Sequence, residues 1–235
     1  IFVALIIGQL IFRRMIGLGT VSVLGVVALY ALIWAGPSLP IIMPDAILGL
    51  SDKASWIVLL FIYAAIASLL PVWMLLQPRD YINGLQLFIG LILMYAAVVI
   101  SGPELVAPAF NMETPEGTPS LVPLLFVTIA CGAISGFHGL VSSGTTSKQI
   151  EKETDIRFVG YFGAIGEGSL SLATIIAVTA GFATLADWQA VYSSFGQGGV
   201  AAFVSGGANI LTNGIGLDNT IAQTLLTVMA VLFAG

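Results

Sequence analysis

Long apolar runs constrain the fold of this chain more than any other feature of its sequence. A helix needs about 20 consecutive, mostly apolar residues to cross a bilayer. Hydrophobic residues make up 58% of the 235 residues and charged residues 8%, whereas a soluble domain carries about 25% charged residues. We therefore expect an all-α, polytopic bundle of transmembrane helices. Runs of spanning length, with the first and last incomplete, cover 1–12, 19–36, 54–76, 82–101, 121–143, 158–182 and 219–235.

The segment between the last two runs and the two chain ends need a separate interpretation. Residues 183–218 combine Asp187, Trp188 and Tyr192 with a following stretch rich in Gly and Asn. We expect an external segment that is interfacial or re-entrant, because irregular backbone at membrane depth must be covered by protein or water. Whether 197–217 spans or re-enters stays open. Because the sequence opens and closes inside apolar runs and does not start with Met, we expect 1–235 to be one transmembrane domain from a longer, transporter-sized protein.

The distribution of charge predicts the orientation of the helices. When the runs alternate across the membrane, six of the seven basic residues fall on one side, in the loops 13–18, 77–81 and 144–157. Basic residues are enriched in cytoplasmic loops of membrane proteins. We therefore expect these loops to be cytoplasmic.

Glu167 is the only charged residue between Phe158 and Phe182. A carboxylate at membrane depth costs about 2.5–3.5 kcal/mol on insertion scales, so such residues usually face a bundle interior or an aqueous cavity and mark a path for ions, protons or substrate. The alternative is a protonated Glu that ties two helices together by hydrogen bonds. Gly160, Ala164 and Gly168 form a stripe of small residues beside it, which favours close helix packing.

The run 121–143 carries a second polar stripe. Thr128, Cys131, Ser135, His138 and Ser142 recur at helical spacing, as expected for a helix that lines a cavity. His138 is the only histidine and is a candidate proton carrier, or else a buried histidine that ties helices together. The hydroxyls that follow are expected either to cap a short cytoplasmic helix over 148–155 or to hold a carboxylate-bearing substrate; they belong to Ser142, Ser143, Thr145 and Thr146.

Prolines mark a candidate gating segment near residue 75. Pro71 bends the helix predicted over 54–76 because it removes one hydrogen bond. The polar stretch that follows ends the run at the membrane boundary, and transporters place broken helices at their sites. The alternative is a kinked helix with an ordinary cytoplasmic turn. The stretch contains Gln77, Pro78, Arg79 and Asp80.

Three motifs, in this order and spacing, resemble the carbon starvation protein A family of CstA-type transporters. They are LLPVWMLLQPRDYING, ACGAISGFHGLVSSGTTSKQI and VGYFGAIGEG, and the resemblance covers about Ser55 to Phe182. It implies a polytopic inner-membrane protein, induced when carbon is scarce, that takes up peptides or, in some branches, pyruvate with protons. It also implies kinship with the amino acid–polyamine–organocation transporters and their inverted repeats.

The sequence and the resemblance together predict a secondary transporter that imports peptides or a small carboxylate such as pyruvate, coupled to protons. Glu167 is the expected protonation site, His138 a relay or substrate partner, and Ser135 and the hydroxyl cluster substrate ligands. The alternative is a non-transporting membrane scaffold or sensor. No enzyme motif is present, and we expect no cofactor, metal or nucleic-acid partner.

Overall fold

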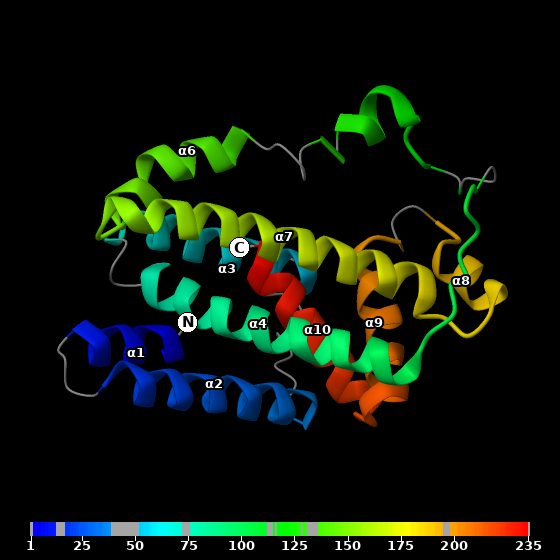
Figure 1. Cartoon of the computed structure of the whole chain (residues 1–235), viewed down its shortest axis with the longest axis horizontal. Helices are drawn as coiled ribbons and strands as arrows, with labels where there is room; N and C mark the ends of the chain where they lie inside the picture. The colour runs from blue at the N-terminus through cyan, green and yellow to red at the C-terminus, as the bar shows by residue number, and fades with distance from the viewer. Residues whose placement is uncertain are drawn as a thin grey trace. The chain divides into compact units, whose positions relative to one another are not determined.

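The computed structural model describes residues 2–12, 17–38, 52–71, 76–111, 115, 117–127, 129–130, 136–194 and 198–234. These residues form helices and connecting segments without a strand (Figure 1), so the prediction of an all-α bundle is confirmed. The α-helices are α1 (Phe2–Phe12), α2 (Leu18–Ala35), α3 (Asp52–Leu69), α4 (Leu76–Ser101), α6 (Gly136–Gly144), α7 (Glu153–Ala180), α8 (Leu185–Val191), α9 (Val200–Ile215) and α10 (Asn219–Ala234). Short turns of other helix types are η1 (Gly36–Ser38), η3 (Leu121–Leu125) and η4 (Thr146–Lys148).

Within the described ranges, three helical segments are long and apolar enough to cross a membrane by length and composition: Gly19–Ser38, Gln77–Ser101 and Glu153–Ala180. Shorter apolar helices cover Ala54–Leu69, Val200–Ile215 and Asn219–Val231. Large apolar side chains stay exposed on these helices, as Phe61 on α3 (72%) and Ile165 on α7 (65%) illustrate. Such surface suits contact with lipid or with other helices rather than with water.

Several helix bounds differ from the predicted runs. α3 ends at Leu69, two residues before Pro71, and α4 begins at Leu76 instead of residue 82. The run 121–143 is not one regular helix over its described residues, because Val122 has extended backbone angles (φ −118°, ψ 126°) inside η3. In the segment expected to be interfacial or re-entrant, the chain forms the helices α8 and α9.

The chain divides into two compact units, and the single transmembrane domain expected over 1–235 stays a prediction. The first unit comprises Ile1–Ser101 and Leu211–Gly235, and the second comprises Gly102–Ile210. In the first unit α1, α2, α4 and α10 pack against one another. Inside a bilayer, lipid tails are as apolar as the side chains, so helices associate mainly through close van der Waals contact and small residues at the crossings.

Glycines bring these helices of the first unit close together. A Cβ on Gly25 of α2 would lie 2.5 Å from Ile7 Cδ1 of α1. Gly90 of α4 lies against Met229 of α10 in the same way. The core of this unit contains Ile7, Val21 and Ile82, with Leu10 and Leu29 packed around them.

Candidate functional site

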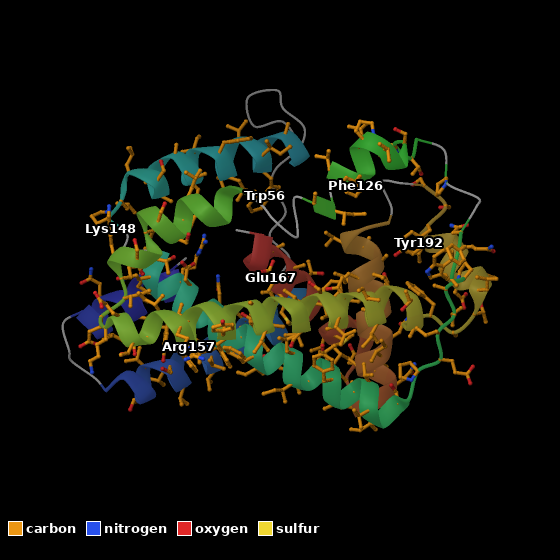
Figure 2. All side chains as sticks on the ribbon, turned by 45° about the horizontal axis from the view of Figure 1, so that its top comes forward. Trp56, Phe126, Lys148, Arg157, Glu167 and Tyr192 are labelled. Atoms are coloured by element: carbon orange, nitrogen blue, oxygen red, sulfur yellow. The ribbon has the colours of Figure 1, made fainter. Side chains whose placement is uncertain are left out.

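Glu167 lies midway along α7, in the second unit (Figure 2). It is fourteen residues after the start of the helix at Glu153, about 21 Å along the axis. Its side chain is exposed and has no hydrogen-bond or ion-pair partner among the residues that the structure describes. The backbone carbonyl of Glu167 accepts a hydrogen bond from Ser171 Oγ at 3.0 Å. The helix therefore presents a single carboxylate halfway along a segment of spanning length.

The predicted role of His138, as a relay or substrate partner that acts with Glu167, remains a prediction. Ser135 and the side chain of His138 lie outside the described part of the chain. The backbone of His138 is in α6, six residues before that helix ends at Gly144. At 1.5 Å per residue, His138 lies about 9 Å from the connection to α7 and Glu167 about 21 Å from it. In a hairpin the two positions would therefore differ in level by about 12 Å.

The hydroxyl cluster lies at the C-terminal end of α6. Ser142 Oγ donates to the Gly139 carbonyl at 3.0 Å, and Ser143 Oγ donates to the Leu140 carbonyl at 3.2 Å. Each of these hydroxyls therefore donates its hydrogen bond to a carbonyl of its own helix. A carboxylate accepts hydrogen bonds only, so binding one here requires these local bonds to break. The cluster also lies at a helix C-terminus, where the macrodipole disfavours an anion.

The short helix expected over 148–155 does not form. Thr145 N donates to the Val141 carbonyl at 2.9 Å at the end of α6, and Thr146 then begins the three-residue turn η4. α7 begins instead at Glu153, after Lys152 in an extended conformation, with Glu153 and Asp155 in its first turn. Carboxylates are favourable in the first turn of a helix because they offset the positive end of its dipole. This stabilisation explains why the acidic stretch starts the long helix.

The candidate gating residues lie within α4 rather than in a helix break. Gln77, Pro78 and Arg79 follow Leu76 in its first turn, and Asp80 comes directly after them. Pro78 fits there because the first N–H groups of a helix have no partner within that helix. Arg79 Nε lies 3.6 Å from Asp80 Oδ1. α3 ends upstream at Leu69, and Pro71 follows two residues later, outside that helix.

The small-residue stripe of α7 makes no close contact with the residues that the structure describes. A Cβ on Gly160 or Gly168 would meet nothing within 4 Å among the described residues. The close crossing is between the end of α7 and α9, where a Cβ on Gly206 would lie 3.0 Å from the Ala177 carbonyl carbon. Asn209 Nδ2 donates to the Gly181 carbonyl at 2.9 Å, one helical turn further along α9. The sequence signal for this contact was the Ser-Gly-Gly-Ala-Asn stretch in a segment that we expected to be interfacial or re-entrant.

Three further donors cap the end of α7. Trp188 Nε1 of α8 donates to the Val178 carbonyl at 3.0 Å. The backbone N–H groups of Val106 and Ala107 donate to the Thr179 carbonyl at 2.9 and 3.1 Å. The last carbonyls of a helix have no partner within it, so these bonds satisfy groups that would otherwise be unpaired. The end of α7 is thus tied to the segment after α4 and to α8.

Tyr192 directly follows α8 as its C-cap and lies beside Trp188. Their ring centroids are 4.8 Å apart, and Tyr192 is half-buried. Burial raises the pKa of the Tyr192 phenol above its ordinary value of 10.0, because the charged phenolate is less well solvated there. Among the described residues, no group of three or more His, Cys, Asp and Glu side chains is arranged to hold a metal ion.

Comparisons with known proteins place these observations in a family. The family model described as carbon starvation protein CstA matches residues 1–194. The chain is 42% identical over 169 residues to the pyruvate/proton symporter BtsT of Escherichia coli strain K12, which is 68% of this chain and 23% of that protein. It is 42% identical over 124 residues to the peptide transporter CstA of Campylobacter jejuni, covering 51% of this chain and 18% of that protein.

A third relative is similar over nearly the whole chain. The peptide transporter CstA of Bacillus subtilis strain 168 is 33% identical over 239 aligned residues, which cover 96% of this chain and 39% of that protein. The chain therefore spans about a fifth to two fifths of the length of these relatives. No solved structure matches the chain.

Proposed function

The chain belongs to the carbon starvation protein CstA family, and from that premise we propose that it is part of a secondary transporter that imports peptides or pyruvate together with protons. The names of the relatives, peptide transporter and pyruvate/proton symporter, support this proposal. The observation that carries it within this chain is Glu167, a single carboxylate midway along a helix long enough to span the membrane.

Glu167 is the proposed protonation site. Burying an ionised carboxylate away from water is costly, whereas the protonated form is neutral and can cross a low-dielectric region. A site that alternates between these two forms couples substrate movement to protons if its exposure changes between the two sides of the membrane. His138 is the proposed relay or substrate partner. Ser135, Ser142, Ser143, Thr145 and Thr146 are proposed substrate ligands, and the serines described here would first exchange their bonds to α6 carbonyls for bonds to substrate.

A matched pair of variants in the full-length protein tests Glu167. Glu167→Gln keeps the size of the side chain but cannot carry or release a proton, so it should abolish accumulation of labelled pyruvate or dipeptide driven by a proton gradient. Glu153→Gln makes the same chemical change in the first turn of the same helix and should change uptake less than about two-fold, because that residue lies at the aqueous end of the helix. Unchanged proton-driven uptake by Glu167→Gln would remove this residue from the mechanism. A wild-type protein that is folded and accumulates neither substrate would favour a scaffold or sensor.

We further propose that the protein lies in the bacterial cytoplasmic membrane with loops 13–18, 77–81 and 144–157 on the cytoplasmic side. Exposed positions on the two proposed sides are Glu151 and Glu104. In a cysteine-free full-length background, a cysteine replacing Glu104 should react with a membrane-impermeant maleimide added to intact cells. A cysteine replacing Glu151 should react only after the membrane is opened. The reverse pattern would invert the topology. Pro71, two residues after the end of α3, is the proposed flexible joint for alternating access, together with Gln77–Asp80 near the start of α4.

A further inference from the structure

One polar side chain lies on the buried face of α4, in the first unit. Ile82, Gln86, Gly90 and Met94 follow one another at intervals of four residues and are all buried. Ile82 packs in the core with α1 and α2, and Gly90 lies against Met229 of α10. Gln86 sits between them with 1% of its side chain exposed. An amide therefore occupies the centre of a helix face that is otherwise apolar or small.

Among the residues that the structure describes, neither end of the Gln86 amide has a hydrogen-bond partner. Both Nε2 and Oε1 are buried without one. The great majority of buried polar side-chain atoms are paired, and an unpaired one calls for a specific cause such as a water, an ion or a functional role. An apolar side chain of similar size would avoid the cost of burying two unpaired groups. The position of Gln86 therefore indicates a ligand that supplies both a donor and an acceptor.

A second unpaired polar group lies at nearly the same level on the neighbouring helix. The Tyr30 hydroxyl of α2 is buried and has no hydrogen-bond partner within the described part of the chain. α2 packs beside α4, and Figure 1 shows the two helices running in the same direction. Ser22 Oγ lies 2.6 Å from Tyr81 Oη across this contact.

The register of α2 against α4 follows from this hydrogen bond. Counting eight residues along each helix from Ser22 and Tyr81 brings Tyr30 level with position 89 of α4. A Cβ on Gly25 would lie 3.8 Å from Ile82 Cγ1. Counting five residues along each helix from this contact brings Tyr30 level with position 87 of α4. Tyr30 and Gln86 are therefore within about three residues of the same level, or about 4.5 Å along the axis.

We propose that Gln86 and Tyr30 form an internal binding site for a small group that both donates and accepts hydrogen bonds. Gln86 Nε2 donates, Gln86 Oε1 accepts, and the Tyr30 hydroxyl can do either. A peptide group has this chemistry, with one N–H and one carbonyl, and so does a water molecule. A carboxylate has only acceptors and cannot satisfy Gln86 Oε1. The site therefore takes the peptide group of a transported substrate or a trapped water, and not the carboxylate of pyruvate; the first of these two sources rests on the proposed transport function.

Three variants of the full-length protein separate these sources. Gln86→Met removes the amide at similar volume, Tyr30→Phe removes only the hydroxyl, and the double variant combines both changes. The matched control is Gln223→Met on α10, where the exposed Gln223 Nε2 donates to Asn219 Oδ1 at 2.7 Å. For each protein, the KM for dipeptide and for pyruvate uptake is measured, together with the Tm with and without dipeptide.

A peptide-binding site predicts a selective effect on substrate. Gln86→Met should raise the KM for dipeptide about tenfold, the effect of losing about one good hydrogen bond, and should change the KM for pyruvate less than about two-fold. The rise in Tm caused by dipeptide should also shrink. Gln223→Met should leave both KM values unchanged.

A trapped water predicts a different result. Both KM values should stay unchanged, whereas Gln86→Met and Tyr30→Phe should each lower the Tm of the ligand-free protein, and their combined effect should be smaller than the sum because they share one ligand. The proposal is overturned if both KM values stay unchanged and Gln86→Met leaves the Tm equal or raises it. If the wild-type protein transports neither substrate, the proposed function fails, while the Tm comparison still tests the site.

Discussion

Replacing Gly206 with Ala tests whether the crossing of α7 and α9 holds the second unit together. A Cβ on Gly206 would lie 3.0 Å from the Ala177 carbonyl carbon and 3.3 Å from Phe182 Cε2, and it would come closer still to the Ala177 carbonyl oxygen. The carbonyl belongs to the backbone of a helix, so it cannot rotate away as a flexible side chain would. The two helices must therefore separate to admit one methyl group.

The expected cost follows from three opposing contributions. Overpacking a close contact costs about 1–3 kcal/mol. Separation of the helices also stretches the 2.9 Å bond from Asn209 to the Gly181 carbonyl, worth about 1 kcal/mol. The higher helix propensity of alanine offsets about 1 kcal/mol of this destabilisation. The balance is a destabilisation of about 1–3 kcal/mol.

Thermal unfolding of the purified full-length protein measures this effect, with Gly160→Ala as the matched control. Gly160 is also within a helix, but a Cβ there would meet no described residue within 4 Å, so the control should be unchanged or stabilised by up to about 1 kcal/mol. The Tm values should therefore fall in the order Gly160→Ala, wild type, Gly206→Ala. A Gly206→Ala protein that melts at or above the wild-type temperature would refute the close crossing.

Three other predictions follow from single contacts. Asn209→Leu should destabilise the protein by about 1 kcal/mol, because the Gly181 carbonyl loses its donor, and thermal unfolding should show less than additive loss when it is combined with Gly206→Ala. Gly90→Ala should cost less than Gly206→Ala in the same assay, because its Cβ would meet the flexible side chain of Met229. Burial raises the pKa of Tyr192, so the stability that this residue contributes should be complete below about pH 10. That stability should be lost as the pH rises through the higher pKa of the folded state. Ultraviolet titration should show one tyrosine that ionises at higher pH than the others, and Tyr192→Phe should remove this signal.

The spans were predictable wherever hydrophobic length decided the outcome. Gly19–Ser38, Gln77–Ser101 and Glu153–Ala180 correspond to the expected runs 19–36, 82–101 and 158–182. The start of α4 was predicted six residues late because Pro78 and the charged Arg79 and Asp80 suggest a boundary, although proline is well tolerated in the first turn of a helix.

The candidate site was predictable only in part. Glu167 stands out in sequence because a charge within a long apolar run is rare. The surroundings of Glu167 depend on which helices lie beside α7, and no local sequence pattern predicts which helices those are. The small-residue stripe beside Glu167 predicted a close crossing there, yet the described crossing is at Gly206. Small residues permit close approach, but the partner helix determines which of them is used.

Hydropathy and the placement of charge were enough to establish an all-α chain with membrane-spanning helices and to single out Glu167, because both follow from the cost of moving polar groups out of water. The unpaired amide of Gln86 and the bonds that cap α7 became visible only in three dimensions. In the sequence, Gln86 is one of several polar residues near the start of a helix, and Asn209 is part of a glycine-rich segment. Burial and pairing are properties of neighbours that are distant in sequence, so only the packed helices decide them.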